Sequence, residues 1–259
     1  MNINSGIISL WTKKTLIFHL SIMEIKMRYK ESFLSFLWVI LEPLFMFIIL
    51  YIVFSNIREP REENFAIYLI SGIIFYHLFT KGTMTGLTSI RNNQGILKSL
   101  SINKNIFPII AVTTTALLLI VEIVIFFGIM PFVSFVPSWT LIMMPFVIIL
   151  LLVLILGLSY LLSVLYVKIP DIQPVWTILM YALLFVSPIF WSIDEANDTL
   201  LTIQQINPLG QIIELSHKIV FNEVPIIEDW IQTSLIVSSI LIVGYTFFRK
   251  FEKTIVEEL

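Results

Sequence analysis

The chain has 259 residues, of which 58% are hydrophobic and 13% are charged. Soluble domains carry about 25% charged residues and about 45–50% apolar ones, so the excess of apolar side chains must face lipid. A membrane-spanning helix takes about 20 residues, which leaves room for about six spans with their loops. We therefore expect no attached nucleotide-binding domain.

Charge and cysteine content exclude further classes. The net charge of −2 gives no electrostatic indication of nucleic-acid binding. The absence of cysteine excludes disulfides, thiolate metal sites and cysteine nucleophiles. The first 35 residues carry five lysines and arginines but no short apolar core with a cleavage site. We expect the first span to act as the insertion signal and to be retained.

Residues 1–35 contain two stripes at helical spacing between positions 11 and 31. This pattern is typical of a cytoplasmic helix lying in the membrane interface, and the alternative is a short basic leader with chance periodicity. The apolar stripe consists of Trp11, Thr15, Phe18, Ile22, Ile25 and Tyr29, and the polar stripe of Lys14, Ser21, Glu24, Arg28 and Glu31.

Six apolar segments follow and predict an all-α, polytopic membrane protein with one transmembrane domain over residues 1–259. Gly157 and Ser159 in the fourth segment are small enough to pack closely, and Gly82 and Gly86 have the spacing of a close helix contact. The predicted spans cover residues 36–54, 65–80, 106–127, 141–166, 174–191 and 230–248.

The distribution of lysine and arginine predicts that both termini are cytoplasmic. With that orientation, thirteen of the sixteen basic residues lie inside, including Lys81 in the connection after the second span. Only Arg58, Arg61 and Lys218 lie outside. Cytoplasmic loops carry the excess of positive charge in membrane proteins.

Two connections are long enough to have their own structure. The outer one, 192–229, contains a predicted amphipathic helix at 209–221. A cytoplasmic tail at 249–259 follows the last span. The inner one, 88–105, is basic and predicts a short surface helix. No internal repeat supports an inverted-repeat carrier. The apolar side of the outer helix comprises Ile212, Ile213, Leu215, Ile219 and Val220.

Two carboxylates lie within predicted spans, where a charge costs about 2.5–3.5 kcal/mol on insertion scales. Glu42 precedes Pro43, which removes a backbone donor and can kink the helix. For Glu42, a water-filled path and a structural carboxylate bonded to a neighbouring helix remain open equally. For Glu122 we favour the structural interpretation.

No constellation for catalysis or metal binding is evident. No glycine stands in a G-x-x-x-x-G-K-[ST] motif, so the chain does not hydrolyse ATP by itself. His19, His77 and His217 are too dispersed for a metal site. The acidic group at 194–198 could bind a cation, but a solvated loop is the better interpretation. We expect no enzyme, cofactor or metal site in this chain.

Aromatic side chains follow one face of the first span. Such rings offer carbohydrates a flat, weakly polar surface, and the alternative is ordinary packing with an interfacial aromatic belt. The stripe in the first span includes Phe33, Phe36, Phe47, Tyr51 and Phe54, and the fifth span adds Trp176, Tyr181, Phe185, Phe190 and Trp191.

The run 28–38, RYKESFLSFLW, followed by Glu42-Pro43, resembles the R-Y-K-x-S-x-L-G-x-x-W…P stretch of type-2 ABC exporter permeases. These permeases export O-antigen, teichoic acid and capsular polysaccharides. Ser35 stands where the family commonly has glycine, and Lys168-Ile-Pro-Asp171 replaces its usual Arg-Asp pair. Further motifs in matching order are Leu69-Ile-Ser-Gly72, Phe107-Pro108, Asp171, Ser187-Pro188 and Asn207-Pro208-Leu209.

The resemblance implies a homodimer in the plasma membrane (the inner membrane in bacteria), with six spans per subunit and two copies of a separate ATPase that binds ATP and Mg²⁺. It implies a leader at the interface, gate helices in the outer loop and a channel between spans 1 and 5. The connection between spans 2 and 3 would contact the ATPase through Arg91, Asn92, Gln94, Leu97 and Lys98. Gate or structural roles fall to Glu42, Pro43, Ser187, Pro188, Asn207 and Pro208.

The mechanistic hypothesis is that an undecaprenyl-diphosphate-linked glycan approaches from the inner leaflet. Arg28 and Lys30 would attract its diphosphate. An exporter of drugs, lipids or haem, an ion-coupled carrier and a membrane-bound enzyme remain as alternatives. The glycan would follow channel-lining residues Phe33, Phe36, Phe47, Tyr51, Phe54, Trp176, Tyr181 and Phe185.

Overall fold

The computed structural model describes residues 14–28, 35–57, 64–99, 103–133, 135–252 and 254–256. Every regular element in these ranges is a helix. Five helical segments are long and apolar enough to cross a membrane, and α8 (Ile172–Val186) is apolar but shorter. The prediction of an all-helical protein with several spans is confirmed, with one of the six expected spans reduced in length.

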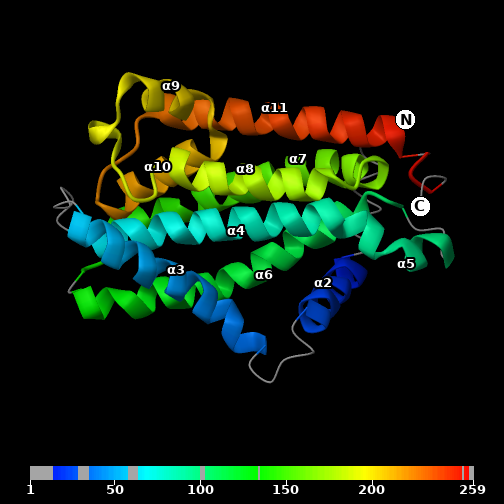
Figure 1. The fold of residues 1–259 in the computed structure, drawn as a ribbon, viewed down its shortest axis with the longest axis horizontal. Helices are drawn as coiled ribbons and strands as arrows, with labels where there is room; N and C mark the ends of the chain where they lie inside the picture. The colour runs from blue at the N-terminus through cyan, green and yellow to red at the C-terminus, as the bar shows by residue number, and fades with distance from the viewer. Residues whose placement is uncertain are drawn as a thin grey trace.

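Figure 1 shows the helices as a bundle with smaller helices at both ends. The long helices are α3 (Ser35–Ile57), α4 (Phe65–Asn92), α6 (Ile106–Ile129), α7 (Met144–Lys168) and α11 (Ile227–Phe251). The shorter α-helices are α2 (Lys14–Arg28), α5 (Gln94–Ser99), α9 (Asp198–Ile206) and α10 (Pro208–Val220). Single 3₁₀ turns are η1 (Met130–Val133), η2 (Trp139–Met143), η3 (Ile193–Glu195) and η4 (Thr254–Val256).

Helix α4 is the centre of the bundle. It packs against α6 and α7, and α7 packs in turn against α11. Helices α9 and α10 lie at one end of the bundle, whereas α5 and the end of α11 lie at the other (Figure 1). Helix α3 crosses α4 at an angle, and 11% of its spanning part is buried, against 78% for α4. Most of α3 is therefore left to face lipid or another chain.

Small residues allow the long helices to approach closely. A Cβ atom added at Gly86 of α4 would collide with Ser159 of α7. A Cβ atom at Gly244 of α11 would collide with the carbonyl oxygen of Gly157 of α7. The close contacts expected of Gly86, Gly157 and Ser159 are confirmed, and Gly244 is the partner that the sequence did not reveal.

The α7–α11 contact gives a direct test of this packing. We expect Gly244→Ala to lower the free energy of unfolding by about 1–3 kcal/mol, because the methyl group must push two helix backbones apart. The measurement is the thermal denaturation midpoint of the full chain in detergent. Gly128→Ala is the matched control, since a Cβ atom there meets nothing within 4 Å. Equal midpoints for the two variants would contradict the packing.

The second span continues beyond its predicted end at residue 80. Helix α4 has 28 residues, or about 42 Å at 1.5 Å per residue, which exceeds the hydrocarbon core of about 30 Å. Lys81 therefore lies within the continuous helix α4 rather than in a separate loop, and its cytoplasmic position stays a prediction. The prediction stopped at the first charge, but Lys81 has a carboxylate partner on α3.

The fifth span is shorter than predicted. Helix α8 ends at Val186 rather than at residue 191. Pro188 disfavours a helical conformation for the residue before it, and Ser187 is extended with φ −83° and ψ 148°. The proline that the sequence marked as a span terminus thus ends the helix before Phe190 and Trp191.

The outer connection contains the amphipathic helix that its pattern predicted. Helix α10 starts with Pro208 in its first turn, where a missing N–H is tolerated. Helix α9 was not predicted, although Asn197 caps it by accepting a hydrogen bond from the Leu200 N–H at 2.9 Å. The predicted apolar side of α10 is buried, as shown by Ile212, Ile213, Leu215, Ile219 and Val220.

Helix α2 packs against α6 through part of its polar stripe. Ser21 is fully buried, and its hydroxyl donates to the Ile110 carbonyl at 3.3 Å. Glu24 accepts a hydrogen bond from the Thr114 hydroxyl at 3.3 Å. Phe18, on the apolar stripe, is 47% exposed. The apolar stripe is thus left partly free to contact the bilayer, and the interface position remains a prediction.

Candidate functional site

The aromatic stripe of α3 forms ring contacts with other elements. Phe47 and Tyr51 stack with their centroids 5.6 Å apart, and Tyr51 stacks on Phe65 of α4 at 6.1 Å. One turn further, Phe54 stacks on Phe190 at 4.2 Å, and Phe190 meets Phe185 of α8 edge-to-face at 5.8 Å. We call this set the aromatic wall: Phe47, Tyr51, Phe54, Phe65, Phe185 and Phe190.

The aromatic wall has an open surface. Tyr51 is 39% exposed and Phe185 is 60% exposed, whereas Phe47 and Phe54 are half-buried. Rings that stack on one another hold their orientation, and their free faces remain accessible. The wall therefore joins α3 to α8 through Phe54, Phe190 and Phe185, and the lining role of Phe47, Tyr51, Phe54 and Phe185 stays a prediction. Phe65 was missed, because it stands alone at the start of a span.

The other predicted lining residues lie apart from the wall or outside the described residues. The Trp176 indole N–H donates to the Thr83 hydroxyl of α4 at 3.1 Å, so this ring is directed into the bundle. Tyr181 is 64% exposed on α8. Phe36 belongs to α3, but its side chain is outside the described part, and Phe33 lies outside it altogether.

Four ionisable side chains form a polar chain across α6, α4 and α3. The His77 Nδ1 atom lies 2.5 Å from the Glu122 Oε1 atom, and its Nε2 atom lies 3.6 Å from the Glu42 Oε2 atom. The Lys81 Nζ atom lies 2.8 Å from the Glu42 Oε1 atom. Glu122 is 1% exposed, whereas Glu42 is half exposed.

The polar chain gives both carboxylates a partner on a neighbouring helix. For Glu122 this agrees with the structural interpretation that the sequence favoured. Glu42 is paired with Lys81 on α4 and is half exposed at the edge of α3, so both alternatives stay open for it. His77 and Lys81 were missed as a pair. Their spacing of four residues on one helix face was the available signal.

Two of the predicted gate residues, Ser187 and Asn207, come together at the end of α8, whereas Glu42 and Pro43 lie on α3. The Asn207 side-chain amide donates to the Ser187 hydroxyl at 3.0 Å, and both residues are buried. The Tyr68 hydroxyl of α4 donates to the Trp191 carbonyl at 2.8 Å. The ring of Tyr68 also stacks on His217 of α10 with centroids 3.7 Å apart. The outer connection is thus tied to α4 and to the end of α8.

The opposite end of the bundle carries the predicted coupling residues. Leu97 of α5 is buried, and the remaining four (Arg91, Asn92, Gln94 and Lys98) are exposed. The Arg91 guanidinium lies 5.1 Å from the centre of the Tyr166 ring of α7, a cation–π contact. An apolar anchor with exposed polar side chains is suited to docking a second protein.

The residues predicted to attract the diphosphate are Arg28 and Lys30. Arg28 ends α2, and its side chain is outside the described part. Lys30 lies outside the described residues.

Burial changes the protonation of two groups on α10, outside the spanning helices. Burial raises the pKa of the Glu214 carboxyl to about 7, although the neighbouring Lys218 opposes this change. Burial lowers the pKa of His217 to about 3, against the effect of its hydrogen bond to the Tyr68 carbonyl. His217 is therefore neutral at pH 7, whereas Glu214 titrates near it.

Glu214 predicts a pH dependence of stability. The folded chain holds its proton up to about pH 7, but an unfolded chain releases it near pH 4.5, so stability falls as pH rises between these values. We expect a loss on the order of 1–2 kcal/mol, and Glu214→Gln should remove this slope. Thermal midpoints of the full chain from pH 4.5 to 8 test this. The exposed Glu228→Gln is the control, and an unchanged slope in Glu214→Gln would refute the assignment.

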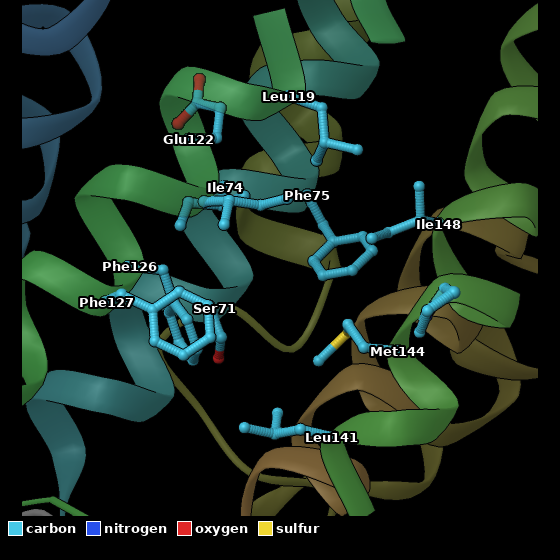
Figure 2. Close-up of a pocket in the computed structure, with 12 residues that line it drawn as sticks. Ser71, Ile74, Phe75, Leu119, Glu122, Phe126, Phe127, Leu141, Met144 and Ile148 are labelled. Carbon is cyan, nitrogen blue, oxygen red and sulfur yellow. The ribbon is translucent and has the colours of Figure 1, made fainter. Parts of the chain in front are cut away.

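An apolar groove of about 220 Å³ lies between α4, α6 and α7. Figure 2 shows Phe75 of α4 directed toward Ile148 of α7, with Leu119 and Phe127 contributed by α6. A groove with this lining suits hydrocarbon chains in a membrane, and we assign it no further role.

In the described ranges, no three histidine or acidic side chains converge on a possible metal site.

Comparison with known proteins assigns the chain to a family. A family model described as ABC-2 type transporter matches residues 15–221, from α2 to the end of α10. The chain belongs to the ABC-2 type transporter family. The matched region of this ABC-2 chain contains the polar chain, the aromatic wall, α5 and the buried Ser187–Asn207 contact. Helix α11 lies beyond it.

Several relatives of this ABC-2 chain carry names of polysaccharide export proteins. An O-antigen export system permease protein RfbA of Klebsiella pneumoniae is 26% identical over 91% of this chain and 92% of its own length. A polysialic acid transport protein KpsM of Escherichia coli is 28% identical over 78% of this chain and 79% of its own. An O-antigen export permease RfbA of Myxococcus xanthus is 22% identical over 68% and 67%.

Proposed function

We propose that this chain is the membrane subunit of an ATP-driven exporter that moves a lipid-linked polysaccharide across the plasma membrane. The observation that carries the proposal is the similarity, over 91% of the chain, to permeases named for O-antigen export. Polysialic acid transport proteins are similar over 78%. The glycan would be of the O-antigen, teichoic acid or capsule type.

The passage would form between two copies of the chain. Helix α3 is the least buried of the long helices and carries half of the aromatic wall, so a second copy could cover it and enclose the rings. Aromatic faces allow sugars to slide without strong hydrogen bonds that would trap them. The homodimer, the crossing of α8 as a sixth span and the lining by Tyr181 belong to this proposal, whereas Trp176 is directed into the bundle, toward Thr83.

The free energy for transport would come from ATP hydrolysis by a separate ATPase, present in two copies, that binds ATP and Mg²⁺. It would dock at the cytoplasmic end on the exposed residues around α5, with both termini on the same side. Closure of the ATPase pair would push on α5, which is continuous in space with the long helix α4. The chain itself would perform no hydrolysis.

The glycan would arrive from the inner leaflet. Arg28 at the end of α2 and Lys30 after it would attract the diphosphate of an undecaprenyl-linked donor. Anionic lipid head groups are attracted to basic side chains near the membrane surface by about 1 kcal/mol each. The sugars would then move along the aromatic wall.

Deletion of the gene tests the proposal in the producing cell. We expect the surface polysaccharide to disappear and the lipid-linked glycan to accumulate inside, with both restored by the wild-type chain. Extraction of the carrier-linked glycan measures the second effect. A deletion strain that keeps its surface polysaccharide but becomes sensitive to drugs would overturn the proposal in favour of a small-molecule exporter.

A further inference from the structure

A polar cavity lies among α9, α10 and α11, at the end of the bundle opposite α5. Its volume is about 250 Å³. The proposed orientation places this end outside the cell. Four glutamines and three charged residues dominate its lining: Gln204, Gln205, Gln211, Gln232, Glu214, Lys218 and Asp229.

Gln204 is the most unusual residue of this cavity. It is 6% exposed, and within the described part of the chain neither its Oε1 nor its Nε2 atom has a hydrogen-bond partner. The Oε1 atom of Gln211 is likewise buried and unpaired there. Leaving a buried polar group unsatisfied costs about 1–3 kcal/mol, so a ligand that bonded these amides would recover that cost.

The local packing holds Gln204 in this position. The Gln204 Oε1 atom packs against Gly210 of α10, so a Cβ atom added at Gly210 would collide with it unless the Gln204 side chain moved. The backbone carbonyl of Gln205 accepts hydrogen bonds from the side-chain amides of Gln211 at 2.7 Å and Gln232 at 3.3 Å. The cavity is therefore built by contacts among all three helices.

A second cavity, of about 260 Å³, shares Ile193, Glu214 and Lys218 with the first. It is lined by further polar groups, among them Asp194 and Glu223. Lys218 is already paired with Asp229 at 2.8 Å. The two cavities thus adjoin at these three residues, and we call them together the polar groove.

The charges of this groove select the class of ligand. Acidic side chains outnumber the single lysine, which disfavours a phosphate or another anion. Amides donate and accept hydrogen bonds, and carboxylates accept them, which matches hydroxyl groups that do both. A hydroxyl-rich, uncharged ligand can therefore satisfy the groove, including its unpaired amides.

We infer that this groove binds an uncharged, hydroxyl-rich stretch of the exported glycan after it has crossed the membrane. The inference rests on the proposed function, because it assumes that sugars reach this end of the protein. Sugars held here would be hindered from sliding back along the aromatic wall between power strokes. Gln204 and Gln211 are the specificity-determining residues.

The test measures binding of short oligosaccharides, prepared by hydrolysis of the cell's own surface polysaccharide, to the full chain in lipid nanodiscs. We expect Gln204→Leu and Gln211→Ala each to weaken binding about tenfold. Gln211 is half-buried, so its variant keeps the test valid if Gln204→Leu does not fold. Thr202→Ala, on the exposed side of α9, should bind as the wild type does.

The outcomes separate this inference from the proposed function. Equal binding by both glutamine variants and the control overturns the inference, as does competition by inorganic pyrophosphate. Absence of oligosaccharide binding by the wild-type chain, in a cell whose deletion strain loses its surface polysaccharide, overturns the inference alone. A deletion strain that retains its polysaccharide overturns the proposed function and the inference with it.

Discussion

Replacement of both Phe47 and Tyr51 by alanine should abolish glycan export. The two rings stack at 5.6 Å and connect through Tyr51 to Phe65, so their loss opens a gap in the middle of the aromatic wall. Both side chains are partly exposed, and their removal leaves no fully buried cavity. The measurements are the amount of surface polysaccharide and the yield of ATPase co-purified with the chain.

The ATPase yield should stay at the wild-type level, because the wall is remote from α5. Phe146→Ala on α7 is the matched control, since Phe146 is 63% exposed and belongs to no ring contact in the described residues. Surface polysaccharide should persist in this control. Unchanged export in the double variant would refute the lining role of α3.

The second large effect concerns the buried pair of the polar chain. His77→Leu should destabilise the protein by about 3–5 kcal/mol, because Glu122 would remain as a buried carboxylate without its partner. The thermal midpoint of the full chain in detergent measures this loss. Glu42→Gln should cost less than His77→Leu, since the amide oxygen of glutamine can still accept a hydrogen bond from the Lys81 ammonium group.

A compensating variant separates burial of charge from loss of packing. The double change His77→Leu and Glu122→Leu replaces both partners by apolar side chains, and stability should return to within about 1 kcal/mol of the wild type. If the double variant is as unstable as His77→Leu alone, the pair does not act as proposed. Export by a stable double variant would assign the pair a structural role only.

The sequence predicted those features that depend on local pattern. The apolar side of α10 follows from its helical spacing, and Ile212 and Ile213 are fully buried as that spacing requires. The aromatic face of α3 was also readable, because its rings recur at three and four residues. Gly86 and Ser159 were recognisable as small residues, although their mutual contact depends on the register of two distant helices.

The features that were missed depend on partners from elsewhere in the chain. Lys81 looked like the end of a span, because a lone lysine in a membrane is costly, and its carboxylate partner lies 39 positions earlier. The unpaired amide of Gln204 has no sequence signature, since it depends on how α9 and α10 pack together. Contacts of this kind can be identified only when the positions of the helices relative to one another are known.

The most direct test of the account is transport in sealed vesicles that contain the purified chain and its ATPase. We predict that lipid-linked glycan crosses only when both proteins and ATP with Mg²⁺ are present. Neither an ion gradient nor the chain alone should move it. Transport by the chain without the ATPase, or none with the complete set, would contradict the account.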